Sequence, residues 1–439
     1  MHLKRGREWL DRLLVLVLAL CTVESALRLL AEPASGTEPV RILGRPLPPF
    51  DLLAGLQLAP TRYEEAAPAR LQRGDNLTRG DLWGISRLDP DLGHAPRESA
   101  ESRAGWWQSN SLGARDRDET PVEIPAGRVR ILAFGDSYTH GSRVPQEATW
   151  PAQLEDLQPA LDVVNFGVDG YGMAQSYLRY REIRERVRHD GVVLVFVPGA
   201  DLPRDVNVFR PLLDWQSPIS TPRFELTGRC EGSVLEASGL HRVAPYFPTV
   251  SAFAAANRGQ LDAGFRDHLR CHDAHYRRSA YEQIPLIGAS YIARLCAAVV
   301  DSWRARVMEM NWMEPESEAV QVERGIFRAI SSQVAQGNGR FLLAYLPLIH
   351  EIERGRAEAE FRASWSAMID ATCPDAPMCL DLLAVLAAEP ANAIDEGRGS
   401  HYGAATNQLI AKAIGDAIVR GGWLGSMRDA PSSPRSGLR

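Results

Sequence analysis

The segment Val129-Arg-Ile-Leu-Ala-Phe-Gly-Asp-Ser-Tyr-Thr-His-Gly141 joins a short apolar run to a turn and then to a polar stretch. A run of six residues that is apolar apart from Arg130 and ends at glycine is typical of a buried strand. The segment therefore predicts a strand, a tight turn and the start of a helix, which is the repeating unit of an α/β fold.

Working outward, the same pattern recurs along the chain. Further apolar runs lie at Val163–Phe166, Val192–Val197 and Phe341–Leu346, with a shorter one near Leu380. Amphipathic stretches separate them, at about 150–158, 172–189, 321–337, 357–370 and 403–420. Short apolar strands without alternation, separated by helices, favour a parallel sheet that is buried on both faces. We therefore predict a three-layer α/β/α, doubly wound fold with a mostly parallel sheet.

The 439 residues divide by composition. We predict an N-terminal signal anchor or transmembrane helix over 1–31, and an irregular lead-in rich in Pro and Gly over 32–126. A single α/β domain over 127–424 follows, with an insertion at about 205–320 where the strand-helix rhythm stops. We predict a disordered tail over 425–439.

Composition excludes several classes of protein. A net charge of −6 with no run of Lys or Arg argues against nucleic-acid binding. Only Lys4 and Lys412 are lysines among the 49 basic residues, a bias that we attribute to a GC-rich genome. The six cysteines show no zinc spacing, and we predict disulfides between Cys373 and Cys379 and between Cys230 and Cys271.

The amino terminus indicates export. An apolar run over residues 13–30 follows Lys4, Arg5, Arg7 and Arg12, and about 18 helical residues span about 27 Å, close to a bilayer core. Three interpretations stay open: a retained single-pass anchor, a cleaved signal peptide, and a lipoprotein signal at Cys21. All three place the body outside the cytoplasm, in a periplasmic or extracellular location.

Chemically useful residues follow the predicted strands. Ser137 comes directly after the first strand, Gly167 and Gly172 follow the second, Gly199-Ala200-Asp201 follows the third, and His401 precedes the last helix. Because ligands bind outside the carboxyl ends of parallel strands, we expect these residues to converge.

These blocks resemble the SGNH, or GDSL-like, serine hydrolase family, and the resemblance covers about residues 90–420. Segments such as Asn110–Arg117 and Glu24–Arg28 also look like a membrane-anchored bacterial subgroup of that family. The resemblance implies that Ser137 is the nucleophile and that His401 is its general base. It also implies an oxyanion hole formed by the N–H groups of Ser137 and Gly167 and by an asparagine side chain.

The chain departs from the family pattern at two points. Ala200 stands where the oxyanion-hole asparagine is expected, and Asn207 is close in sequence but has the wrong spacing. The aspartate expected two or three residues before the histidine is also missing. We rank Asp395 above Glu396 as the acid that orients His401, and a backbone carbonyl is the other alternative.

Each candidate also has a structural interpretation. Ser137 could cap a helix, and His401 could be a surface histidine. His140 is predicted to be structural or a pocket wall, Asp136 to fix its loop, and Cys296 to be buried.

We predict a membrane-anchored esterase that acts through an acyl-enzyme on a carbohydrate or other small ester, with no cofactor and no metal. A catalytically degenerate glycan-binding or envelope protein is one alternative, because of Ala200. An O-acetyltransferase of extracellular polysaccharide is another, by analogy alone.

Overall fold

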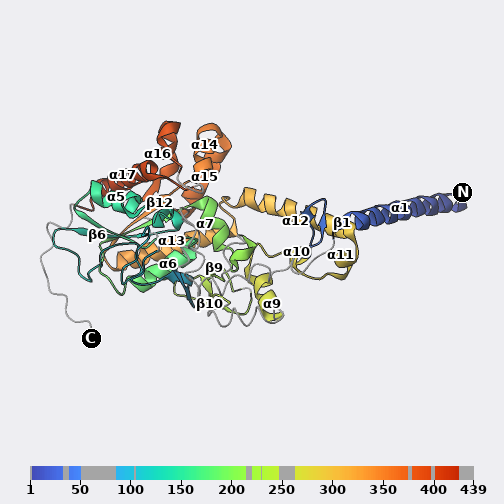
Figure 1. The fold of residues 1–439 in the computed structure, drawn as a ribbon, viewed down its shortest axis with the longest axis horizontal. Coiled ribbons are helices and arrows are strands. Elements are labelled where there is room, and N and C mark those ends of the chain that lie inside the picture. Colours follow the sequence, from blue (N-terminus) through green and yellow to red (C-terminus); the bar gives the residue numbers. More distant parts are fainter. Residues whose placement is uncertain are drawn as a thin grey trace.

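A five-stranded parallel sheet forms the centre of the molecule (Figure 1). The computed structural model describes residues 2–32, 39–50, 86–102, 105–213, 220–228, 230–246, 263–373, 378–396 and 401–424. The strands of this sheet are β6 (Val129–Phe134), β7 (Leu161–Asn165), β8 (Gly191–Phe196), β12 (Arg340–Tyr345) and β13 (Cys379–Asp381). Their spatial order is β13-β12-β8-β6-β7, and every neighbouring pair is parallel. This is the doubly wound order 2-1-3-4-5.

The sheet is buried on both faces. In β6, Leu132 and Phe134 point into one apolar core, whereas Ile131 and Ala133 point into the other. All of these side chains are at most 1% exposed. This two-sided burial explains why the strands are continuous apolar runs without alternation.

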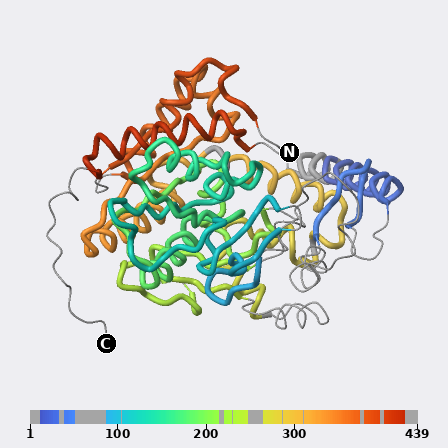
Figure 2. The backbone as a smooth tube through the Cα atoms, turned by 60° about the vertical axis from the view of Figure 1, so that its left-hand side comes forward, coloured from blue at the N-terminus to red at the C-terminus, as the bar shows by residue number. Residues whose placement is uncertain are grey.

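Helices cover both faces of the sheet. The first core contains side chains of α6 (Met173–Ile183), α13 (Glu318–Gln336) and α15 (Ala359–Thr372). The second contains side chains of α5 (Trp150–Leu157), α16 (Leu382–Ala388) and α17 (Ala404–Arg420), and α16 and α17 are among the red elements of Figure 2. The predicted three-layer α/β/α fold is confirmed.

Three short helices follow carboxyl ends of the strands, and the sequence predicted only the start of the first. They are α4 (Ser137–His140), α7 (Pro198–Asp205) and α14 (Ile349–Ala357). Short 3-10 turns are η2 (Gln146–Ala148), η3 (Arg210–Leu212) and η4 (Ala391–Ala393). Helices of eight or nine residues are too short to give a clear periodic pattern, which is why the sequence did not reveal α7 and α14.

Within its described residues, the stretch predicted as an insertion contains a small antiparallel sheet in the order β10-β11-β9 and four α-helices. These elements are β9 (Arg223–Glu225), β10 (Ser233–Leu235), β11 (His241–Val243), α9 (Ala263–His272), α10 (Arg278–Tyr281), α11 (Pro285–Ala289) and α12 (Tyr291–Asn311).

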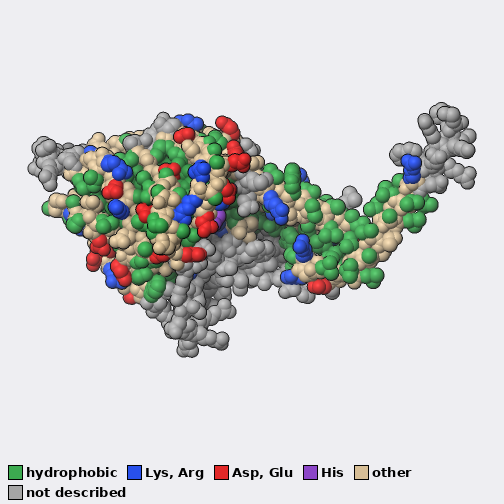
Figure 3. All heavy atoms as spheres, turned by 90° about the horizontal axis from the view of Figure 1, so that it is seen from above, with side chains coloured by type: hydrophobic (Ala, Val, Ile, Leu, Met, Phe, Trp, Pro, Cys, Tyr) green, Lys and Arg blue, Asp and Glu red, His purple; other side chains and the backbone are tan. Residues whose placement is uncertain are grey.

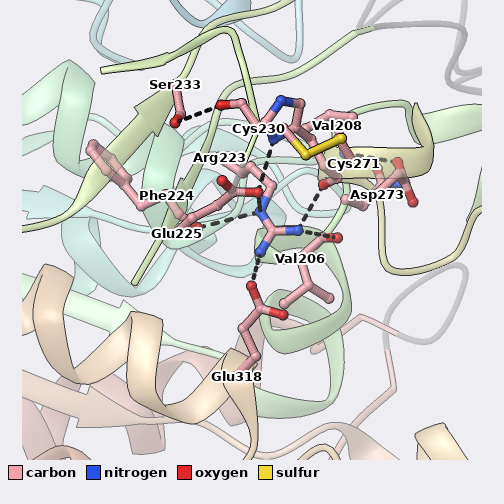
Figure 4. Close-up of polar contacts among 12 residues, drawn as sticks. Val206, Val208, Arg223, Phe224, Glu225, Cys230, Ser233, Cys271, Asp273 and Glu318 are labelled. Carbon is pink, nitrogen blue, oxygen red and sulfur yellow. Dashed lines mark hydrogen bonds and ion pairs between the residues drawn. A yellow bond between two sulfur atoms is a disulfide. The ribbon is translucent and has the colours of Figure 1, made fainter. Parts of the chain in front are cut away.

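Arg223 ties this stretch to the main domain (Figure 4). Its guanidinium donates to the carbonyl oxygens of Val206 and His272, at 3.1 and 2.7 Å, and to Glu318 at the start of α13, at 2.6 Å. Its side chain is only 2% exposed, so these partners compensate a charge that is withdrawn from water.

Both predicted disulfides are present in the structure, and Figure 4 shows the Cys230–Cys271 bridge beside Arg223. The prediction that Cys296 is buried was wrong, because its side chain is exposed on α12. The helical period had suggested a core face there, but that part of α12 faces outward.

The lead-in contributes two small sheets. One is the hairpin of β4 (Ser86–Asp89) and β5 (Gly93–Pro96), and the other has the order β1 (Ala31–Glu32), β2 (Arg41–Ile42) and β3 (Arg45–Pro46). Residues 51–85 of the lead-in and the predicted tail at 425–439 lie outside the described residues.

The first helix, α1 (His2–Leu30), extends away from the body (Figure 1). Its segment Arg12–Leu30 is long and apolar enough to cross a membrane, a property that a signal sequence shares. Figure 3 shows apolar side chains along this arm, and Leu14, Val15 and Leu16 are all more than half exposed.

Glu24 joins α1 to the body. Its carboxylate accepts hydrogen bonds from the N–H groups of Tyr291 and Ile292, at 3.0 and 3.1 Å, and from the hydroxyl of Ser290 at 2.9 Å. Arg28 pairs with Glu24 and donates to the carbonyl oxygen of Ala289. A carboxylate at the first turn of α12 is favourable, because the free N–H groups there carry partial positive charge.

Candidate active site

Ser137 lies just past the carboxyl end of β6, at the first position of α4. Asp136 caps this helix, and its Oδ1 accepts the N–H of Tyr138 at 2.9 Å. Gly135 makes the sharp turn, since a Cβ there would lie 2.8 Å from the carbonyl oxygen of Val195 and closer still to Thr139 Oγ1. The Gly-Asp-Ser sequence thus brings the serine to the strand tip because only glycine fits beside β8.

His401 meets Ser137 from the other end of the chain. Its Nε2 lies 2.8 Å from Ser137 Oγ, across a sequence separation of 264 residues. The ring also stacks on Tyr138, with 4.6 Å between ring centroids. In a neutral imidazole with an unprotonated Nε2, the serine hydroxyl donates to this nitrogen, which is the arrangement that a nucleophile and its base require.

Asp395 anchors the segment that carries His401. Its Oδ1 accepts the N–H and the hydroxyl of Thr406, both at 2.7 Å, and its Oδ2 accepts the N–H of Ala405 at 3.1 Å. These bonds lower the pKa of Asp395, although burial acts in the opposite direction. A Cβ on Gly403 would clash with Oδ2, so the loop folds tightly around this carboxylate. Its proposed role as the orienting acid stays a prediction.

The N–H groups at the predicted oxyanion-hole residues differ in whether they are already hydrogen-bonded. The N–H of Ser137 has no hydrogen-bond acceptor in the described part of the chain. The N–H of Gly167 donates to Asn165 Oδ1 at 3.0 Å, and the N–H of Ala200 donates to the carbonyl oxygen of Val197 at 2.9 Å. An ester oxygen would have to replace Asn165 Oδ1 in order to use Gly167.

Gly170 has a backbone N–H that the sequence did not single out. It has φ +79°, its Cβ side is open, and its N–H has no acceptor among the residues described. Its neighbour Tyr171 reaches the site indirectly, since the Tyr171 carbonyl accepts from Arg204, which also contacts Asp136. The sequence feature that points to this N–H is a glycine at the tip of the turn after β7.

Arg204 was also not predicted, and it lies beside the nucleophile's turn. Its Nη1 donates to Asp136 Oδ2, to the carbonyl oxygen of Tyr171 and to Asp201 Oδ1, at 2.9, 3.0 and 3.2 Å. Asp136 and Asp201 are both fully buried. Burial, and then the nearby Asp136 carboxylate, raise the pKa of Asp201 well above its usual range.

His140 is buried and contacts the Ser142 hydroxyl through Nδ1 at 2.9 Å. Burial, followed by the charge of Arg115, holds the pKa of His140 well below its usual value. A neutral histidine in this environment fits the predicted structural role.

A small hollow opens beside the serine and the histidine, and we call it the serine hollow. It is lined by Ser137, Tyr138, Gly141, Ser142, Arg143, His401, Tyr402 and Asn407. Asn407 donates to the carbonyl oxygens of Tyr402 and Gly403, which fixes the loop after His401. The lining combines a serine hydroxyl, an imidazole and a guanidinium.

No family model matches the chain, and no curated protein matches it. Several solved structures are similar. They include LAE5, an alpha/beta hydrolase enzyme from the metagenome of Lake Arreo in Spain (12% identity, TM-score 0.34, 70% of this chain and 100% of that one). A putative lipolytic protein of the G-D-S-L family from Desulfitobacterium hafniense has 14% identity and a TM-score of 0.30, covering 66% and 99%.

An acetyl xylan esterase from Geobacillus stearothermophilus, in a W215I form, has 11% identity and a TM-score of 0.31, covering 69% and 97%. Because identities and TM-scores are this low, the strand order described above is what establishes the fold. By that order, and by Ser137 and His401 meeting at the strand ends, the chain is similar to the SGNH, or GDSL-like, hydrolases.

Proposed function

We propose that this protein is a membrane-anchored serine esterase that removes an acyl group from a carbohydrate or other small ester through an acyl-enzyme. The observation that carries the proposal is the 2.8 Å contact between Ser137 Oγ and His401 Nε2 at the carboxyl edge of the sheet. A serine that only capped a helix would not need a histidine at this distance.

The chemistry follows from this contact. Ser137 Oγ attacks the ester carbonyl while its proton passes to His401 Nε2, and the resulting oxyanion collapses as the C–O bond to the alcohol breaks. The leaving alkoxide takes the proton from His401, which leaves an acyl group on Ser137. Water then attacks the acyl-enzyme with His401 again as the base, which releases the acid and restores the serine.

The N–H of Ser137 is one donor for the oxyanion. Ala200 removes the side-chain donor that the SGNH resemblance implies, and loss of one such donor typically lowers turnover about a hundred- to a thousandfold. We therefore propose a real but slow catalyst.

The same proposal places the body outside the cytoplasm, with α1 as the anchor. Two observations support this location: the apolar segment Arg12–Leu30 near the amino terminus and the two disulfides, which persist in oxidising compartments.

A fluorophosphonate probe tests the proposed activity. We expect the full chain in detergent to be labelled at Ser137, with labelling lost in Ser137→Ala and strongly slowed in His401→Ala. Ser142→Ala is a matched control, because it removes a neighbouring hydroxyl from the same hollow and should leave labelling intact. Equal labelling of the native chain and Ser137→Ala would contradict the proposal.

One observation favours a second candidate, a glycan-binding protein without turnover: Ala200 lies where the resemblance implies an asparagine. It predicts saturable binding of a glycan with no acyl release by either the native chain or Ala200→Asn.

A further inference from the structure

Arg143 is a half-buried cation in the wall of the serine hollow. It forms no hydrogen bond and no ion pair with the part of the chain that the structure describes, and its Nε is buried without a partner. A guanidinium that is partly withdrawn from water without an anion is costly. By contrast, Arg115 and Arg204, which also lie beside the nucleophile's turn, both have partners.

The segment that carries Arg143 is held rigidly. Arg115, which is 2% exposed, donates to the carbonyl oxygens of His140, Gly141 and Val144, on both sides of Arg143. A Cβ on Gly141 would clash with Thr149 Cγ2, so this turn also packs closely against the start of α5. The backbone of Arg143 is therefore held in place at the edge of the serine hollow.

The charge of the hollow is one-sided. Apart from Arg143 and His401, its lining residues are neutral hydroxyl, phenol, amide or glycine groups, and none of the described residues in the lining is a carboxylate. The guanidinium of Arg143 is therefore available, among the described residues, to an anionic group of a bound molecule. Because Ser137 lines the same small hollow, such a group would belong to the molecule that carries the ester.

We propose that Arg143 binds a carboxylate on the substrate, so that the preferred substrate is an acylated acidic sugar. The inference rests on the proposed esterase function and names its substrate class. A carboxylate matches the planar fork of one guanidinium in shape and in charge. A phosphate carries up to two charges and usually engages several donors, and the hollow offers a single permanent cation among the described residues that line it.

The test compares three mono-acetylated methyl glycosides that differ at C6: the glucuronoside, its neutral methyl ester, and the glucoside 6-phosphate. We expect the native chain to favour the glucuronoside over its methyl ester by at least about tenfold in kcat/KM. Hydrogen bonds to charged groups are worth enough to give about a ten- to hundredfold effect. Most of the difference should lie in KM, because the carboxylate is bound in the ground state and in the transition state alike.

Arg143→Gln should abolish this preference, because kcat/KM should fall far more for the glucuronoside than for its methyl ester. Arg143→Lys should retain part of the preference, because it keeps the positive charge but loses the planar pair of N–H donors that matches a carboxylate. Arg117→Gln is the matched control: it removes one positive charge from an exposed residue that pairs with Glu147, and the preference should survive. Thermal unfolding establishes that each variant is folded.

Equal kcat/KM values for the acid and its methyl ester in the native chain would overturn the inference, and so would an equal loss on both substrates in Arg143→Gln. Preference for the phosphate would also overturn the carboxylate assignment. Failure of the proposed function looks different, because Ser137 would then react with neither the fluorophosphonate nor 4-nitrophenyl acetate.

Discussion

Asp136 and the half-buried Arg204 form an ion pair directly beside Ser137, with Asp136 Oδ2 2.9 Å from Arg204 Nη1. Asp136 is fully buried, and its other oxygen caps the helix that begins with Ser137. The pair therefore connects the nucleophile's turn to α7, the helix that contains Ala200.

Breaking this pair should destabilise the fold. We expect Arg204→Met to lower the free energy of unfolding by about 3 kcal/mol or more, because it leaves the Asp136 carboxylate buried without its cation. Urea unfolding monitored by circular dichroism measures this change. Asp136→Asn combined with Arg204→Met should cost less than the sum of the two single changes, and strict additivity would show that the pair is not coupled.

Restoring the absent donor should raise turnover. We expect Ala200→Asn to increase kcat on 4-nitrophenyl acetate at least about tenfold with little change in KM, because the new amide acts on the oxyanion. Ala200→Leu is the control, since it adds similar bulk without a donor and should give no increase. A kcat that is unchanged or lower in Ala200→Asn, in a folded protein, would remove Ala200 as the cause of slow turnover.

Asp395 gives a test that separates stability from catalysis. Its hydrogen bonds hold the start of α17, so Asp395→Ala should lower the free energy of unfolding by about 1–2 kcal/mol. Because the folded pKa lies below the usual value, this stability is present above pH ~4 and is lost as the pH falls through the folded pKa.

The same variant reports on His401. Asp395 is proposed to keep the imidazole in its reactive orientation, and we expect Asp395→Ala to lower kcat at least about tenfold. Asp395→Asn, which keeps one carbonyl acceptor, should recover most of the stability. If kcat is unaffected in both variants while stability falls, Asp395 serves only the helix and another group orients His401.

The sequence was sufficient for the fold because its strands are buried on both faces, and such strands are continuous apolar runs like Val192–Val197. It also brought Ser137 and His401 together correctly, since in a parallel sheet the carboxyl ends of all strands lie at one edge. Neither inference needed a side-chain position.

The remaining features depend on contacts between distant residues. Glu24 meets Tyr291 at the start of α12 across a sequence separation of 267 residues, and no local pattern encodes that contact. Arg204 and Arg143 have distinct positions at the site, but in a chain with 49 basic residues, nearly all of them arginine, neither is distinctive in sequence. The N–H of Gly167 is occupied by Asn165, a detail that depends on one rotamer.

Glu351 makes the stability of the domain depend on pH. It is 3% exposed and lines a cavity of about 650 Å³ next to Gly199, where a Cβ would lie 2.6 Å from its Oε1. Its Oε2 accepts the N–H of Leu348 at 2.7 Å. Burial raises the pKa of Glu351 to about 7, and the Leu348 N–H and the charge of Arg354 offset only part of this effect.

Because its folded pKa lies above the unfolded value, Glu351 stabilises the fold fully below pH ~4.5, and this stability is lost as the pH rises through 7. A shift of this size corresponds to about 3 kcal/mol. The Glu351→Gln variant keeps an acceptor for the Leu348 N–H but cannot ionise. At pH 8.5, we therefore expect this variant to unfold at a urea concentration at least as high as the native chain. At pH 4.5, we expect it to unfold at a urea concentration no higher than the native chain. Glu358→Gln is the control: it replaces a half-exposed carboxylate of the same cavity, and its stability should depend on pH as that of the native chain does. If the stabilities of the native chain and Glu351→Gln depend on pH in the same way, the assignment to Glu351 is contradicted.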